Sequence, residues 1–226
     1  GATSSSTPRF FIFDVTGSTD GSATGITGRG VDSGARVTSA AGTPNPQTAA
    51  NTNEMTVARS KPIFALCTAT NCSKASPAGS TLVPGTSEVI RFRIDAQGDD
   101  VIFDGTNHNI RFTIAQSGGA ATGRTANLYE VGKTATLQAV TGLDLTTAGT
   151  INFNAITTTI SNNTYKEYYA TVDLTDYATA GESFRLSLEN AAADLSWSDG
   201  VSGTADISNA SLTDGLPMTG GTLLKP

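Results

Sequence analysis

Hydrophobic and polar positions alternate with a period of two along most of the chain from Glu54 onward. Successive side chains of a β-strand point to opposite faces, so this alternation predicts half-buried antiparallel strands. The cleanest examples are Glu88–Ile94, Asn109–Ile114 and Phe184–Leu188. Weaker patterns predict strands at residues 55–57, 62–66, 101–103, 127–131, 151–153, 168–174 and 195–199. No segment of ten or more residues has the period of a helix.

The spacing of these strands indicates an all-β fold, because turn sequences such as Ala-Gly-Thr and Ser-Gly-Gly join them at fairly regular intervals. We expect residues 54–226 to form one antiparallel β-sandwich, of the immunoglobulin-like (Ig-like) or the jelly-roll type. Residues 1–53 differ in composition, since seven glycines and a Pro-Asn-Pro sequence interrupt residues 16–53. They predict an N-terminal strand and a Gly- and Thr-rich arm, in which Val31 and Val37 favour one weak strand.

The N-terminal strand is hydrophobic on both faces. Phe11, Phe13 and Val15 share one face, and Phe10 and Ile12 share the other. Burying three or four such side chains is worth roughly 6 to 10 kcal/mol. The next convincing strand pattern begins only at residue 55. The segment therefore either folds back over that distance or pairs with another molecule.

Composition and charge narrow the class of protein. The chain has 226 residues, 15% of them charged, with a formal net charge of -6 and an isoelectric point near 4.7. An acidic chain makes nucleic acids and anionic membrane surfaces poor partners. No hydrophobic run is long enough for a transmembrane helix. Abundant Ser, Thr, Gly and Asn, with a start at Gly1 in place of Met, favour an exported protein whose leader has been removed, located outside the cell or on its surface.

Cys67 and Cys72 are the two cysteines of the chain. In an exported protein, two cysteines this close favour a disulfide that closes a short loop. Such a loop restricts the unfolded chain by about 2 kcal/mol in the loop-entropy model, so the bond would act as a local staple. One cysteine pair and a single distant histidine offer too few ligands for zinc, and we expect no metal site here.

Several runs give residues 58–224 a resemblance to a secreted β-sandwich module found in large surface proteins of candidate-phylum bacteria. The runs that carry it are Pro84–Ile94, Asn127–Tyr129, Ser183–Asn190, Leu195–Asp199 and Leu216–Leu223. The resemblance implies a structural or adhesive role and transfers no catalytic residue. The chain departs from tandem modules of this kind at its front, where the isolated strand and the Gly-rich arm replace a preceding module.

The architecture also resembles subunits of donor-strand filaments, such as TasA-like fibres and archaeal bundling pili. In those assemblies the N-terminal strand of one subunit completes the sheet of the next, and residues 10–15 occupy the corresponding place. This resemblance implies a homopolymer that forms an extracellular filament or sheath. The alternatives are that residues 10–15 are the domain's own first strand, or that the protein is a non-polymerising adhesin or surface-layer module that contacts a sugar, a protein or a host surface.

No recognisable catalytic motif is present in the sequence. His108 is the only histidine, so a Ser-His-Asp triad would need it, and no Gly-x-Ser-x-Gly sequence accompanies it. We expect His108 to be a hydrogen-bonded loop residue and expect no enzymatic activity. Trp197 is expected in the core, with carbohydrate stacking as the alternative. Tyr168 is expected to face the core and Tyr169 the opposite side, where a subunit contact could form.

Two groups of aspartates near predicted strand ends are candidate oxygen ligands for a structural Ca²⁺, although no Asp-x-Asp-x-Asp-Gly loop is present. The alternative is turn chemistry, in which an aspartate accepts hydrogen bonds from nearby backbone. We expect no other cofactor. The aspartates are Asp95, Asp99, Asp100 and Asp104, and Asp194, Asp199 and Asp206.

Two short motifs complete the candidate sites. Leu216–Gly220 matches the LPxTG sorting signal, but no hydrophobic tail follows it, and we expect a final strand or a neighbour contact at Thr222–Lys225. Asn71, Asn162 and Asn209 begin Asn-x-Ser/Thr sequences and are candidate glycosylation sites.

Overall fold

A computed structural model describes residues 58–105, 108–119, 122–191, 193–200 and 213–226, together with the backbone of two short strands in the N-terminal region. Those two strands, β1 (Thr27–Arg29) and β2 (Arg36–Thr38), pair with each other in an antiparallel ladder, and the expected weak strand at Val37 falls in β2. The predicted N-terminal strand at residues 10–15 lies outside the described residues, as do Val31, the predicted strand at 55–57 and Asn209.

Five strands form the first sheet of the sandwich, and all of their pairings are antiparallel. Their alternating side chains place one face on the core and leave the other face outward. In spatial order they are β3 (Lys61–Leu66), β4 (Thr86–Gln97), β11 (Tyr165–Asp173), β7 (Arg124–Glu130) and β8 (Thr136–Leu143). β3 and β8 are therefore the two edges of this sheet.

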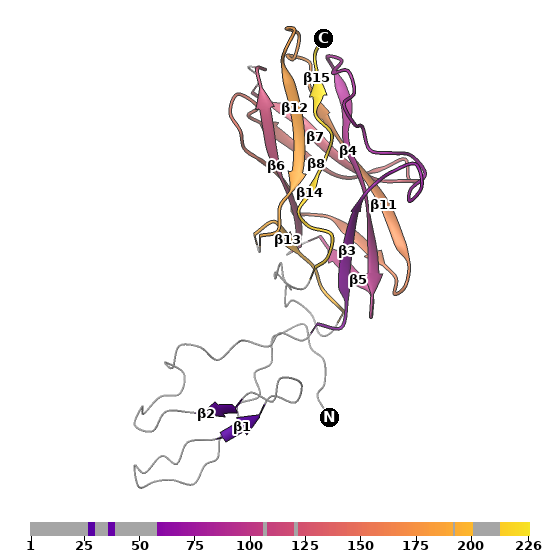
Figure 1. Cartoon of the computed structure of the whole chain (residues 1–226). Helices are drawn as coiled ribbons and strands as arrows, with labels where there is room; N and C mark the ends of the chain where they lie inside the picture. Colours follow the sequence, from indigo (N-terminus) through magenta and orange to yellow (C-terminus); the bar gives the residue numbers. More distant parts are fainter. Residues whose placement is uncertain are drawn as a thin grey trace. The chain divides into compact units, whose positions relative to one another are not determined.

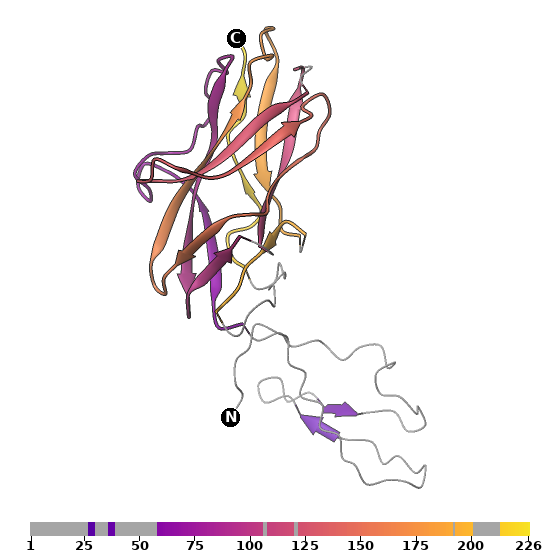
Figure 2. The same cartoon turned by 180° about the vertical axis from the view of Figure 1, so that it is seen from behind.

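The second sheet is centred on the antiparallel pair β6 (Asn109–Ser117) and β12 (Ser183–Leu188). Shorter strands flank the pair: β9 (Thr150–Phe153) and β13 (Leu195–Ser196) beside β6, and β14 (Met218–Thr219) and β15 (Leu223–Leu224) beside β12. A separate ladder joins β5 (Val101–Asp104) to β10 (Thr157–Ile160). Figures 1 and 2 show the sandwich from opposite sides, with β15 lying along β12.

The core lies between the two sheets and is built from large aromatic and aliphatic side chains. Phe92 of β4 contacts Phe112 of β6 edge-to-face, with ring centroids 5.6 Å apart, and so joins the two sheets. Phe92 also stacks with Tyr168 of β11 at 5.6 Å. The all-β, antiparallel sandwich predicted from the sequence is thus confirmed. The described residues contain no helix, and hence no helix that could cross a membrane.

Candidate functional site: sheet edges and a clamped loop

The C-terminal segment covers the outer edge of β3. The Phe64 N–H donates to the Asp214 carbonyl at 2.9 Å, and the Asp214 N–H donates to the Pro62 carbonyl at 3.2 Å. The next residue, Gly215, has a positive φ of 78°, and a Cβ built there would lie 1.8 Å from the Phe64 carbonyl oxygen. This close approach requires glycine and fixes the path of the segment beside β3.

The same segment then runs along β12 and closes this side of the sandwich. The Gly220 N–H donates to the Leu186 carbonyl at 2.9 Å, and the Leu82 N–H donates to the Leu224 carbonyl at 2.8 Å. Met218 and Leu223 are buried in the core. The LPxTG-like residues 216–220 are therefore part of the folded sandwich, and β15 falls within the stretch where a final strand was expected.

The edge strand β8 differs from the covered edges. It pairs with β7 on one side, and no backbone–backbone hydrogen bond joins its other side to any described residue, although its Gln138 side chain accepts the Ala155 N–H at 2.8 Å. Its sequence, Thr-Leu-Gln-Ala-Val-Thr-Gly-Leu, contains no charge and no proline, the devices that usually protect a sheet edge. The β7–β8 ladder has two register shifts, and such irregularities also make a sheet edge less suitable for a further strand. Ala139 and Thr141 are exposed, whereas Leu137 and Val140 pack partly against the core.

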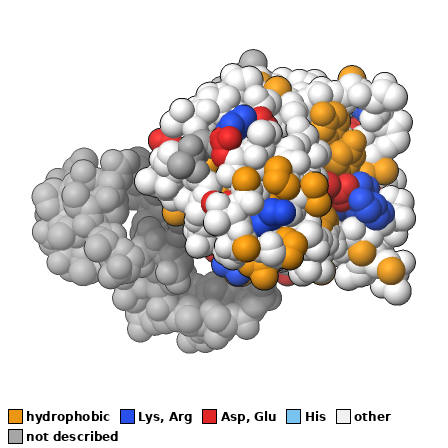
Figure 3. All heavy atoms as spheres, turned by 90° about the horizontal axis from the view of Figure 1, so that it is seen from above, with side chains coloured by type: hydrophobic (Ala, Val, Ile, Leu, Met, Phe, Trp, Pro, Cys, Tyr) orange, Lys and Arg blue, Asp and Glu red, His pale blue; other side chains and the backbone are white. Residues whose placement is uncertain are grey.

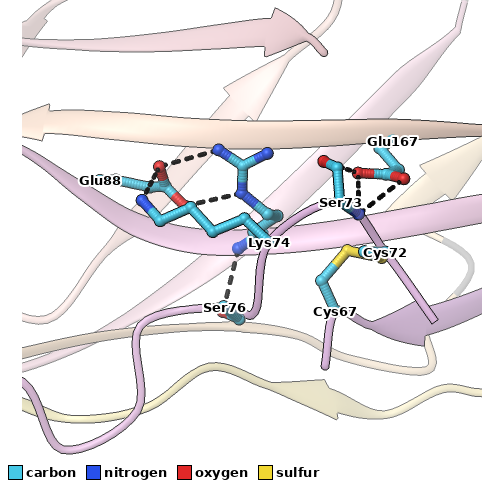
Figure 4. Close-up of polar contacts among 8 residues, drawn as sticks. Cys67, Cys72, Ser73, Lys74, Ser76, Glu88 and Glu167 are labelled. Carbon is cyan, nitrogen blue, oxygen red and sulfur yellow. Dashed lines mark hydrogen bonds and ion pairs between the residues drawn. A yellow bond between two sulfur atoms is a disulfide. The ribbon is translucent and has the colours of Figure 1, made fainter. Parts of the chain in front are cut away.

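A loop closed by the Cys67–Cys72 disulfide lies against the outward face of the first sheet. The Ser73 N–H and hydroxyl both donate to the Glu167 carboxylate, and Arg93 Nη1 donates to the Asn71 carbonyl at 2.9 Å. Figure 4 shows Ser73 and Glu167 facing one another beside the disulfide. Side chains of β4 and β11 thus clamp a loop that leaves the end of β3.

Beneath this loop, Arg91 is held by several partners. Its backbone N–H donates to Ser76 Oγ at 3.0 Å, and its guanidinium donates to both oxygens of Glu88. Lys74 Nζ lies 3.1 Å from the same carboxylate (Figure 4). Burial alone would raise the pKa of Glu88, but hydrogen bonds from Arg91 and Lys74 outweigh it and hold that pKa below its usual value.

Arginine and tyrosine side chains form a row across the outward face of β4, β11 and β7. The Arg91 guanidinium lies 4.8 Å from the centroid of the Tyr169 ring, whose other neighbour is Tyr129, stacked at 4.9 Å. Arg93 lies 4.0 Å from the centroid of Tyr165, a ring that is 49% exposed. Partners therefore cover the ring of Tyr169, whereas Tyr165 offers contact surface to solvent.

Four residues with aromatic rings, whose positions the sequence predicts, lie among the described residues. Tyr168 is buried and Tyr169 lies on the opposite side of β11, as expected. Trp197 is fully buried, so it packs in the core and cannot stack on a carbohydrate at the surface. His108 is buried beside Phe103 in a loop, where its Nδ1 accepts a hydrogen bond from the Asp104 N–H at 3.1 Å.

Each described aspartate considered as a calcium ligand has a partner within the chain. Asp95 pairs with Arg93, Asp99 with Arg59 at 2.6 Å, and Asp194 with Arg111 at 2.7 Å. Asp100 accepts the Asn162 N–H, and Asp199 accepts the Arg59 N–H at 3.0 Å. Asp104 Oδ1 lies 3.0 Å from His108 Nδ1, and Asp206 lies outside the described residues.

Among the described residues, one group of three potential metal ligands lies within mutual reach: Cys67, Cys72 and Glu167. The two sulfurs are bonded to each other, so they are not thiolate ligands. The described aspartates serve in ion pairs and in hydrogen bonds to backbone N–H groups.

The two described glycosylation candidates have different surroundings. The Asn71 amide donates to the Leu66 carbonyl and accepts from the Thr68 N–H, while its sequon serine, Ser73, is bound to Glu167. Asn162 is exposed in the turn between β10 and β11. Asn162 therefore offers the more accessible amide of the two.

The sequence pattern does not predict the arginine–tyrosine row or the clamp on the loop. Cross-strand neighbours decide both, since Arg91 faces Tyr169 and Arg93 faces Glu167 only in the observed register of β4 and β11. The regular spacing of Arg91 and Arg93, with Glu167 and Tyr169 spaced likewise, was the one available signal.

Comparison of the chain with protein-family models, with curated proteins and with solved structures gives no match in any of the three.

Proposed function

We propose that this chain is a structural subunit of an extracellular filament or sheath, which polymerises when its N-terminal segment, residues 10–15, adds as a strand to a neighbouring copy. The observation that carries the proposal is the open β8 edge, which is uncharged and has no described backbone partner on its outer side. Unpaired N–H and C=O groups along such an edge favour pairing with a further strand. The chain supplies a strand-forming segment that has two hydrophobic faces.

The described core is closed, which favours strand addition at a sheet edge over insertion between the sheets. The largest side chains between the sheets are fully buried, and the chain's own C-terminal segment fills the seam beside β3 and β12. A donated strand would therefore extend a sheet at its edge, and no gap in the described core requires it. Head-to-tail addition of this kind does not close on itself and builds a filament.

A deletion of residues 1–16 tests this function. We expect the full chain to form filaments visible by electron microscopy and large species in sedimentation velocity, and the deletion variant to remain monomeric. The sandwich should be intact in both, because residues 1–16 contribute to none of its described strands. Circular dichroism and the fluorescence of the buried Trp197 report the fold independently of assembly.

Two results would contradict the polymer. One is assembly that survives the deletion, since the N-terminal segment would then be dispensable. The other is a full chain that stays monomeric at every concentration, both as purified protein and as native material.

The outward face of the first sheet favours a second function, that of a binding module. Tyr165 is exposed, and Arg93, stacked on it, also donates to the Asn71 carbonyl of the disulfide loop. An aromatic ring and a cation on a rigid strand are typical of interaction surfaces. Figure 3, the view from above, shows hydrophobic side chains gathered beside charged ones on the described surface.

A glycan array and a protein pull-down with the full chain test this second function. Hits that disappear in Tyr165→Ala and persist in the matched variant Tyr169→Phe would support it. Tyr169 is the suitable control because both faces of its ring are already occupied by Arg91 and Tyr129. Identical hits for wild type and Tyr165→Ala would exclude this face as the site.

A further inference from the structure

We infer that the acceptor for the donated segment is the outer edge of β8, and that its occupant is residues 10–15 of a second copy of this chain. This inference rests on the proposed function and specifies the surface on which the proposed polymer forms. It concerns the backbone groups of Thr136–Leu143 that point away from β7.

The other edges leave less room for an added strand. The outer edge of β3 is occupied by Asp214, and that of β12 by β14 and β15. In the second sheet, β6 is flanked by β12 and β13 on one side and by β9 on the other. Among the described strands of the sandwich, β8 combines a length of eight residues with an outer side to which no described backbone–backbone hydrogen bond is made. Its Gln138 side chain accepts the Ala155 N–H at 2.8 Å and donates to Asn154 at 3.1 Å, so the residues after β9 lie close to this strand.

The chemistry of β8 matches a hydrophobic strand. Edges that reject further strands usually carry a lysine or another charge, because a charge is costly to bury in a new ladder. β8 has no charged residue. Its partly buried Leu137 and Val140 would lie beside the core-facing side chains of an added strand. Its other side presents the exposed Ala139 and Thr141, which are small enough to lie beside large neighbours.

The N-terminal segment has the pattern that such a position needs. A strand added at β8 has one face directed toward the sandwich seam and one toward the outward face of the sheet, where its side chains lie beside those of β8. Phe11, Phe13 and Val15 supply one hydrophobic face, and Phe10 and Ile12 supply the other. Six extended residues are also short enough to pair within the eight of β8.

Photo-cross-linking in the full chain tests the assignment. Phe13 is replaced by p-benzoylphenylalanine, and unlabelled and ¹⁵N-labelled proteins are mixed before assembly and irradiation. Peptide mass spectrometry then identifies the partner segment and whether it belongs to the same or to a different copy. We expect mixed-isotope cross-links from residue 13 to the peptide that contains residues 136–143.

The outcomes separate the acceptor from the polymer itself. Mixed-isotope cross-links to a segment other than β8 would overturn the acceptor assignment and leave the proposed function standing. Cross-links confined to single-isotope pairs would place the segment in its own subunit and overturn both. Cross-links to β8 in mixed-isotope pairs support both.

A charged edge gives an independent measurement. Ala139→Lys puts a cation at an exposed position of β8, and Thr159→Lys puts the same cation at an exposed position of β10, a strand of only four residues. We expect loss of the large sedimenting species for Ala139→Lys and wild-type assembly for Thr159→Lys. Equal assembly of the two variants would overturn the acceptor assignment, provided that their circular dichroism spectra match.

Discussion

Arg91 lies on the outward face of β4, yet only 8% of its side chain is exposed. Glu88 binds the guanidinium and Tyr169 lies beside it, while Ser76 of the 67–76 loop accepts the Arg91 backbone N–H. A buried cation is tolerable when its donors are hydrogen-bonded to an ionised partner. Glu88 supplies that partner and also binds Lys74. This one carboxylate therefore links the loop to the sheet through two cations.

Substitution of Glu88 should make the fold less stable near neutral pH. Glu88→Gln removes the charge facing Arg91, and we expect a loss of about 1–2 kcal/mol in the free energy of unfolding at about pH 7. The pKa of Glu88 is lower in the folded chain than its usual value of 4.5. Ionised Glu88 thus stabilises the fold above that value, and the contribution disappears as the pH falls through the folded pKa.

Urea unfolding at several pH values measures this effect. The difference between wild type and Glu88→Gln should shrink as the solution becomes acidic. Glu189→Gln is the matched control, because Glu189 forms no ion pair among the described residues. A difference for Glu88→Gln that is constant with pH would show that its charge has no part in the stabilisation.

Gly215 is a second residue whose identity the structure dictates. Its φ of 78° is unfavourable for other residues, and a Cβ there would also collide with the Phe64 carbonyl. We expect Gly215→Ala to reduce stability by roughly 2–4 kcal/mol. Gly123→Ala has nearly the same φ, 74°, and an open surrounding, so its smaller loss isolates the backbone strain. Equal melting temperatures of the two variants would contradict the collision.

At the scale of elements, two backbone hydrogen bonds of Cys67 hold the start of the loop that the Cys67–Cys72 disulfide closes. The Cys67 N–H donates to the Arg91 carbonyl at 3.0 Å, and the Ser76 N–H donates to the Cys67 carbonyl at 2.8 Å. The disulfide adds a covalent constraint to a loop that β4 and β11 already clamp. Its contribution should therefore be local.

Replacement of both cysteines tests that expectation. Cys67→Ser with Cys72→Ser should cost about 2 kcal/mol of stability, as expected for so short a loop. Hydrogen exchange should quicken at Ser76 and remain slow in β6 and β12, which lie in the other sheet. Wild-type protein under reducing conditions should reproduce the variant. Unchanged exchange at Ser76 would show that the hydrogen bonds alone hold the loop.

The strand patterns that were read correctly share a buried face. β4, β6 and β12 alternate because each has one side in the core, and hydrophobicity records that side. β8 and β10 were not predicted, since β8 is an edge strand with little burial and β10 is the threonine-rich sequence Thr-Thr-Thr-Ile. A strand that is held mainly by backbone pairing shows little hydrophobic alternation in its sequence.

For the whole molecule, the C-terminal segment should matter more to folding than the N-terminal region. We expect residues 58–226 to unfold cooperatively as an independent domain, because the described core is complete within them. Removal of residues 213–226 as well deprives the core of Met218 and Leu223, at a cost of roughly 3–6 kcal/mol. That loss approaches the whole stability of a typical domain.

Thermal unfolding followed by the fluorescence of Trp197 compares the two fragments. The shorter fragment should melt far lower or lack a cooperative transition. Equal melting temperatures of the two fragments would show that residues 213–226 contribute little to the stability of the sandwich.

The sequence by itself determined the all-β class, the main core strands, the closeness of the two cysteines and the two-faced hydrophobic segment at residues 10–15, because hydrophobic periodicity is a local property. It also placed Tyr168 inward and Tyr169 outward. Only the tertiary structure decided that Arg91 stacks on Tyr169, that the C-terminal segment covers β3, and that β8 is left as an open edge. These features depend on which strands become neighbours and in what register, and pairing between distant segments leaves no periodic mark in either one.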